Sequence, residues 1–171
     1  MTIITRKTAS ISTCSTAETD ADEAHPVRVE VIATVAQVQG LAALAVHDAD
    51  STFDHDVTEM TATARHVRHG AVTIAAREAM TMAGPCQVGD VLGVIAGDFA
   101  VVGRDRVEVV VEVLGRLLAA GGELVTLVAG ADGGTTLAGH VEAWVTEHHP
   151  HVDVVSYDGG QERYPLLLSV E

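Results

Sequence analysis

The sequence predicts an α/β fold, with a mixed sheet of about six to seven strands and helices packed on it, in two small subdomains. The 171 residues are 47% hydrophobic but only 3% aromatic, so Val, Leu, Ala and Ile must form the core. Runs of β-branched residues alternate with Ala-rich and Leu-rich segments that have helical spacing. After Gly103 helices and strands alternate in order, which implies at least one parallel pair of strands.

The N-terminal segment, residues 1–26, is rich in Thr, Ser, Ala and acidic residues and has no apolar period, so we expect a disordered tail. The fold is expected to start near Val27, where VRVEVIATV alternates and is β-branched, as in a strand. The following QVQGLAALAVHD predicts a short helix, because Leu41, Leu44 and Ala45 recur at helical spacing.

The middle of the chain predicts a partial α/β subdomain with a hairpin, residues 27–103. Its longest helix is expected over residues 54–70, which have an acidic start, a basic end and Gly70 as C-terminal cap. The remaining elements are expected as follows: a strand over AVTIAARE (71–78), a turn over GPCQVGD (84–90), and two strands of VLGVIAGDFAVVG (91–103) joined around Gly97 and Asp98.

Residues 104–171 predict a βαβ-type C-terminal subdomain. Its apolar end, YPLLLSV, is expected to be held in the sheet, because a chain end frays unless something pairs with it. The expected elements are, in order, a helix ended by Gly121 and Gly122, the strand ELVTLVAG, a helix over TTLAGHVEAWVTEHHP stopped by Pro150, the strand VDVVSYD and the final strand from Tyr164 to Val170.

Charge and composition exclude several classes of function. The net charge of −14 repels phosphate backbones and anionic lipid surfaces, so we expect no nucleic-acid partner and no membrane insertion. The chain has no apolar run of about 18 residues and no signal-peptide pattern, which favours a cytoplasmic protein. Cys14 and Cys86 form no disulfide framework, in keeping with a reducing compartment.

No catalytic, metal-binding or cofactor-binding set emerges from the residues. The densest histidine groups, HVRH (66–69) and HHPH (148–151), are expected at helix C-termini, where a partly charged imidazole suits the helix dipole. No GxGxxG opens a helix and no GxxxxGK[ST] is present. We therefore assign no metal, no cofactor and no catalytic residue.

One glycine-rich loop leaves an alternative open. GADGGTT (130–136) joins a strand to a helix, and its amides are suited to hold a phosphate. The simpler interpretation is a βα loop with Thr135 or Thr136 as the helix N-cap. Together with Asp98, the loop defines the alternative function, a phosphate-handling or nucleotide-handling kinase fragment.

Five strings carry a resemblance: VQGLAALAVHD, EMTATARHVRHGAVTIAARE, GDVLGVIAGDFAVVG, GELVTLVAGAD and YDGGQERYPLLLSVE. From about Val27 to Glu171 the chain resembles the C-terminal region of the fatty acid kinase catalytic subunit, in the DegV-associated, dihydroxyacetone kinase-like family. In that family an N-terminal domain binds ATP and magnesium, a middle domain supports dimerisation, and the C-terminal region docks a separate fatty-acid carrier subunit. The motifs of the kinase domain are absent from this chain.

The resemblance implies a partner-binding C-terminal region with no catalytic site of its own. We expect it to dock the acyl-binding carrier subunit, and, as a truncated α/β layer, to associate with the rest of the kinase or with itself. The candidate partner-binding residues are Thr73 and Arg77, on one side of an expected strand with Ile74 on the other, and Gln39, Gln161 and Arg163, in expected loops.

Overall fold

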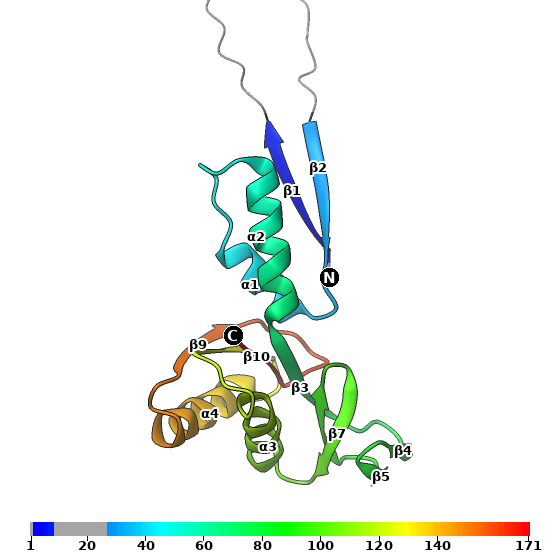
Figure 1. Cartoon of the computed structure of the whole chain (residues 1–171). Coiled ribbons are helices and arrows are strands. Elements are labelled where there is room, and N and C mark those ends of the chain that lie inside the picture. The colour runs from blue at the N-terminus through cyan, green and yellow to red at the C-terminus, as the bar shows by residue number, and fades with distance from the viewer. Residues whose placement is uncertain (1, 9–26) are drawn as a thin grey trace, which may run out of the picture. The chain divides into compact units, whose positions relative to one another are not determined.

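The computed structural model describes residues 2–8 and 27–171, with side chains from residue 28 onward (Figure 1). The chain forms two compact units, Met1–Arg65 and His66–Glu171. The subdomain boundary expected after residue 103 falls inside the second unit, where strands from both sides of it pair in one sheet.

The first unit contains a two-stranded antiparallel sheet and two helices. Thr2–Thr8, within the segment expected to be disordered, instead forms strand β1; residues 1 and 9–26 of that segment lie outside the described residues. The other elements are β2 (Val27–Ala33), α1 (Gln37–Ala45) and α2 (Phe53–His66). Their small core consists of Ile32, Ala43, Met60 and Ala64.

Buried Asp56 joins the start of α2 to the loop before it. Its Oδ1 accepts from the backbone N–H of Asp48 (2.9 Å), and its Oδ2 lies 2.8 Å from Nδ1 of His47. A carboxylate in the first turn of a helix also meets the positive end of the helix dipole. The acidic start read from the sequence therefore serves both the helix and the loop.

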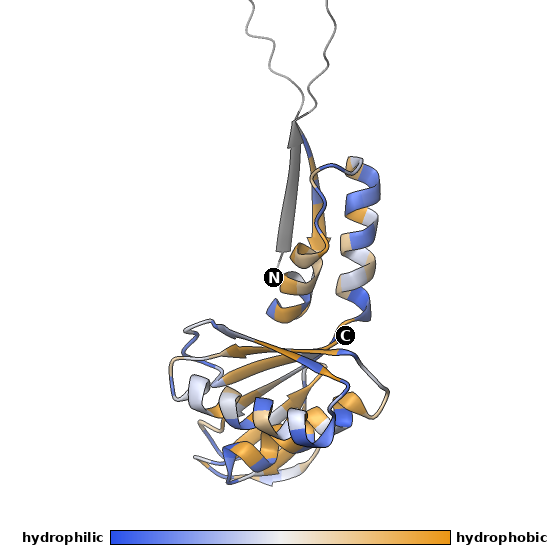
Figure 2. Ribbon diagram, turned by 90° about the vertical axis from the view of Figure 1, so that its left-hand side faces the viewer, coloured by the Kyte–Doolittle hydropathy of each residue, from blue (hydrophilic) through white to orange (hydrophobic). Residues whose placement is uncertain are grey.

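The second unit is built on a six-stranded sheet with strand order β7-β6-β3-β10-β8-β9. Helices α3 and α4 lie on one face of this sheet, as Figure 2 shows. All neighbours are antiparallel except β8 and β9, which confirms the expected parallel pair. The elements are β3 (Arg68–Ile74), β6 (Val91–Ile95), β7 (Asp98–Gly103), α3 (Arg106–Leu118), β8 (Leu124–Ala129), α4 (Gly134–His148), β9 (Asp153–Asp158) and β10 (Leu166–Val170).

Strand β10 lies in the middle of the sheet, between β3 and β8. Leu166 pairs with Val72 on one side and with Ala129 on the other, and every residue of the strand is buried. This explains the apolar run near the end of the chain: the run is a central strand, covered on both faces.

The core of the second unit lies between the sheet and the two helices. Asp105 caps α3 by accepting from the N–H groups of Val107 (2.8 Å) and Glu108 (2.9 Å). The buried valines and leucines of α3 then pack on the sheet at glycine positions. A Cβ on Gly93 would lie 2.5 Å from Cγ2 of Val113. The helix approaches the strand closely only because that side chain is missing.

Gly70 was expected to cap the second helix, but this prediction is wrong. Helix α2 ends at His66, and both Gly70 and His69 lie in β3. A Cβ on Gly70 would lie 2.9 Å from Cγ1 of Val113 and 2.9 Å from the Val94 carbonyl oxygen. The glycine therefore serves close packing of the sheet on α3, and His69 does not sit at a helix C-terminus.

The segment after β3 also differs from expectation. The strand ends at Ile74, so Arg77 lies beyond it, in the connection to a small hairpin. That hairpin pairs β4 (Ala79–Thr81) with β5 (Gly84–Cys86), and β5 occupies the start of the expected turn. Strands of three residues carry too little periodicity to stand out in a sequence.

Helix α4 starts differently from the sequence interpretation. Its N-cap is Gly133, in the left-handed conformation with φ of 69°, and not Thr135 or Thr136. Glycine adopts this conformation without steric cost. Among the described residues, no helix is both long enough and apolar enough to span a membrane.

Candidate functional site

The loops that follow β3, β8 and β9 meet at one end of the second unit's sheet, which we call the loop edge. Leu166, at the start of β10, pairs with both Val72 and Ala129, and Ile74 pairs with Val91. The register therefore brings residues 75–90, 130–133 and 159–165 to the same end of the sheet. Four of the five expected partner-binding residues, Thr73, Arg77, Gln161 and Arg163, lie at this edge.

Two glycine-containing segments interlock there. The N–H of Gly130 donates to the Pro165 carbonyl (2.9 Å), and the N–H of Ala131 donates to that of Gln161 (3.0 Å). In return, the N–H groups of Gly159 and Gly160 donate to the carbonyl of Ala129 at 2.9 and 3.1 Å. The two loops thus form one hydrogen-bonded layer at the ends of β8 and β9.

Gln161 holds this layer together from its side chain. Its Nε2 donates to the backbone carbonyls of Val128 (2.9 Å) and Tyr164 (3.1 Å). A Cβ on Gly159 would strike its Oε1, so the amide lies flat against the glycine turn. The side chain expected to meet a partner is thus occupied by bonds within its own loop.

The structure places Thr73 beside Arg163, although 90 positions separate them in the chain. The Thr73 hydroxyl donates to the Arg163 backbone carbonyl at 3.2 Å. The Arg163 guanidinium lies 5.5 Å from the ring centre of Tyr164, within the range of a cation–π contact. The arginine side chain is exposed and available at the surface.

The β4–β5 hairpin, which the sequence interpretation missed, projects from the same edge beyond Arg77. Met80 is 79% exposed and Met82 is 88% exposed, and Val88 after the hairpin is 66% exposed. The base of the hairpin is anchored, because buried Cys86 packs with Ala75 and Leu92. The alternation of Met80 and Met82 in AMTMA was the available signal, although three residues of it are weak evidence for a strand.

Gln39, the fifth expected residue, lies in the first unit and not in a loop. It is buried in the first turn of α1, and its Oε1 accepts from the N–H groups of Val35 (3.0 Å) and Ala36 (3.2 Å). These bonds satisfy backbone donors at the helix start. The structure does not bring Gln39 into the loop edge.

The elements of the phosphate-handling alternative are also apart. Asp98 lies at the start of β7, four strand positions from β8, or about 19 Å at about 4.8 Å per strand. In the loop 130–136, the carboxylate of Asp132 accepts from the Arg106 guanidinium at 2.7 Å. A Cβ on Gly134 would strike the carbonyl of Pro165, so glycine here serves loop packing.

The histidines of the second unit divide into two environments. His148 stacks on Trp144 with ring centres 4.9 Å apart, and His149 and His151 follow beyond the end of α4. His69 lies within the sheet, where burial lowers the pKa of its imidazole. Across the part of the chain that the structure describes, no group of three or more His, Cys, Asp or Glu residues is arranged to hold a metal ion.

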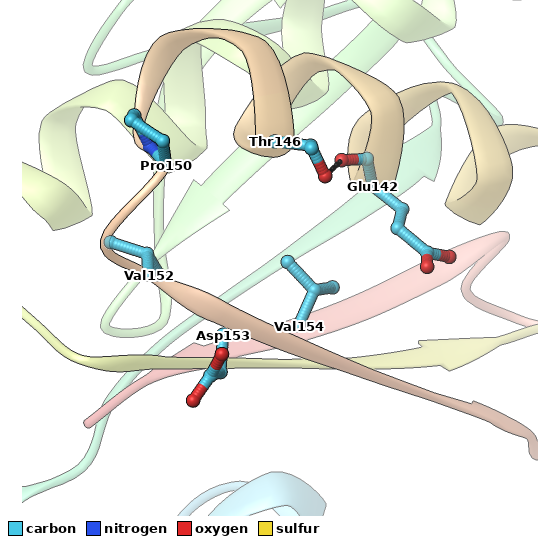
Figure 3. Close-up of a pocket in the computed structure, with 6 residues that line it drawn as sticks. All are labelled: Glu142, Thr146, Pro150, Val152, Asp153 and Val154. Atoms are coloured by element: carbon cyan, nitrogen blue, oxygen red, sulfur yellow. Dashed lines mark hydrogen bonds between the residues drawn. The ribbon is translucent and has the colours of Figure 1, made fainter.

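Two shallow depressions lie along the outer side of β9, between this strand and α4. One, of about 250 Å³, is lined by Glu142, Thr146, Pro150, Val152, Asp153 and Val154 (Figure 3). The other, of about 260 Å³, lies toward the loop edge and includes Thr135, Ser156 and Asp158. Glu142 borders both.

Comparisons with known proteins add relatives of two kinds. Uncharacterized proteins of Staphylococcus aureus strains USA300 and NCTC 8325 are each 28% identical over 141 residues, which is 82% of this chain and 26% of theirs. The chain thus spans about a quarter of the length of the curated relatives it matches. A solved structure described as fatty acid binding of a DegV family protein from Thermus thermophilus aligns at a TM-score of 0.48 and 14% identity, covering 79% of this chain and 56% of that one.

The sequence match to a family is the more extensive finding. Residues 2–171 match the FakA-like C-terminal family, which describes the C-terminal region of fatty acid kinase subunits. The match spans both units, including strand β1 and the final strand β10. The chain therefore belongs to the FakA-like C-terminal family of fatty acid kinase subunits.

Proposed function

We propose that this chain is the partner-binding C-terminal region of a fatty acid kinase-like protein and that it docks a fatty-acid carrier subunit. The observation that carries the proposal is the family match over residues 2–171. In this proposal the ATP-dependent step belongs to a separate kinase domain, and the chain acts in lipid metabolism by presenting the carrier to it.

The β4–β5 hairpin and its surroundings are the surface best suited to this docking. We define the hairpin surface as Arg77, Met80, Met82 and Val88, all of them exposed. Methionine and arginine are enriched at protein interfaces, and the flexible thioether adapts to an apolar partner surface. Arg163, exposed at the same edge of the sheet, provides a second cation.

The hairpin is also held well enough to act as a fixed contact. Thr81 Oγ1 donates to the Gly84 carbonyl at 2.6 Å, and Cys86 is buried against Ala75 and Leu92. An anchored contact loses less conformational entropy on binding than a mobile loop. The two methionines can therefore contribute most of the free energy of their burial to the complex.

Isothermal titration of this chain with the acyl-loaded carrier protein of the same organism tests the proposal. We expect binding, and the double variant Met80→Ser/Met82→Ser should raise Kd at least about tenfold, since burying one Met contributes about 1.5–3 kcal/mol. Val35→Ser is the matched control, because Val35 is 83% exposed in the first unit. No measurable binding would refute docking, whereas equal affinity of the double variant would refute this choice of surface.

A further inference from the structure

The two edge strands of the second unit's sheet differ in how well they are protected. Strand β7 has a bulge: Val101 pairs with Gly93 and Phe99 with Val94, so Ala100 between them has no ladder partner. The carbonyl of Ala100 accepts instead from the Arg116 guanidinium at 2.9 Å. Bulges and capped carbonyls are common ways to prevent a sheet edge from pairing with another chain.

Strand β9, at the opposite edge, has none of these protections. It pairs with β8 in unbroken parallel register over all six residues, from Asp153 to Asp158. It contains no proline, lysine or bulge, and five of its six residues are exposed, including Val155 and Tyr157. Its outer side therefore presents a regular row of backbone donors and acceptors to solvent.

The depressions described above run beside this open edge. The first includes Val154, and the second includes Ser156 and Asp158. These residues alternate along β9 on the side of the sheet that α4 covers. Alternate side chains of a strand added to β9 repeat every two residues, about 6.5–7 Å, so two of them would enter the two depressions. A backbone edge combined with pockets for alternate side chains is the arrangement of strand-addition sites.

The charge along the edge indicates which segment fits. Glu142 borders both depressions, and Asp153 and Asp158 lie at the two ends of β9. Within residues 66–171, none of these three carboxylates has an ion pair. A second copy of β9, paired antiparallel about its centre, would place Asp153 opposite Asp158, and like charges directly opposite are destabilising. An added strand with Lys or Arg at alternate positions would instead meet an acidic residue at each end and Glu142 between them.

We propose that the outer edge of β9 is a strand-addition site for an extended, positively charged segment of a partner protein. The site is separate from the hairpin surface, because β9 and β7 form opposite edges of the sheet and the β4–β5 hairpin lies on the β7 side. It therefore stands or falls independently of carrier docking at that surface.

The experiment uses synthetic peptides of about seven residues, a usual strand length. The probe alternates lysine and valine, and a second peptide has glutamate in place of each lysine. Nuclear magnetic resonance follows the amides of the full chain during each titration. We expect the basic peptide to shift the amide resonances of β9 and α4 and to slow hydrogen exchange in β9, whereas the acidic peptide does neither.

Two further comparisons separate strand addition from simple charge attraction. The double variant Glu142→Gln/Asp153→Asn should weaken the basic peptide at least about threefold, whereas Asp98→Asn at the β7 edge should not. A lysine–valine peptide methylated on alternate backbone nitrogens keeps its charge but cannot complete a ladder, so it should not slow exchange in β9. Equal binding of the methylated peptide, or shifts outside β9 and α4, would overturn the proposal.

Discussion

The side-chain nitrogen Nε2 of Gln161 lies 2.9 Å from the backbone carbonyl oxygen of Val128, so a residue of the last loop closes the end of strand β8. The Gln161→Ala variant leaves this part-buried carbonyl without its donor. We expect the free energy of unfolding to fall by about 1–3 kcal/mol. Urea denaturation measures the change, and Gln87→Ala, at an exposed glutamine, is the control. Equal midpoints for the two variants would contradict the structural role of Gln161.

Gly130 has no room for a side chain, because a Cβ there would strike the Tyr164 carbonyl and lie 2.7 Å from that of Gln161. Both contacts are to backbone atoms, which cannot rotate away. We expect Gly130→Ala to destabilise the second unit by about 2–4 kcal/mol. Gly115→Ala is the matched control, since that Cβ meets nothing within 4 Å on α3 and should stabilise the helix by up to about 1 kcal/mol. Thermal unfolding of both variants gives the comparison, and a loss for Gly115→Ala as large as that for Gly130→Ala would argue against packing as the cause.

His69 predicts a dependence of stability on pH. Burial lowers the pKa of its imidazole below 6.5, so the folded state favours the neutral ring. Above pH 6.5 the ring is neutral in both states and the contribution is fully present. As pH falls below 6.5 the unfolded chain takes up the proton first, and stability decreases until the folded pKa is passed.

Denaturation between about pH 7.5 and about pH 5.5 measures this loss, which for one proton has a slope of at most about 1.4 kcal/mol per pH unit. The His69→Gln variant should lose less stability over this interval than the wild-type chain. His151→Gln, at an exposed histidine, should follow the wild type. A profile for His69→Gln that matches the wild type would remove His69 as the source.

Ser169 and Thr73 make a contrasting pair of hydroxyls. Ser169 is fully buried, and its Oγ has no hydrogen-bond partner among the described residues, whereas Thr73 donates to Arg163. We expect Ser169→Ala to change stability by less than about 0.5 kcal/mol or to increase it, and Thr73→Val to reduce it by about 0.5–1.5 kcal/mol. Guanidinium denaturation measures both. A large loss for Ser169→Ala would show that its hydroxyl is satisfied.

Elements with strong local signals were predicted well from the sequence. Helix α3 has a clear apolar face and two terminal glycines, and the β6–β7 hairpin has its turn at Gly97 and Asp98; the structure confirms both. Strand β10 was expected within the sheet because its apolar run needs partners, and it lies there. In each case the signal is contained in one short segment.

The features that sequence reasoning missed depend on distant residues. Gly70 reads as a helix cap from its neighbours, and only the approach of Val113 shows why it lies in a strand. The contact between Thr73 and Arg163 joins segments that nothing in the local pattern relates. The hairpin between β4 and β5 consists of strands too short for a periodic signal. The candidate site therefore needed the fold, although the glycine turn before Arg163 already placed that residue in a loop.

The central position of β10 also sets the order in which the second unit can be assembled during synthesis. β3, β6 and β7 leave the ribosome first as one antiparallel group, and β8 and β9 follow as a parallel pair. The two groups share no strand ladder until Leu166–Val170 has emerged and inserted between them. Until then both groups expose unpaired edges, a state that favours aggregation or chaperone capture. The complete sheet can therefore form only after β10 has been synthesised, and not while the earlier strands are emerging.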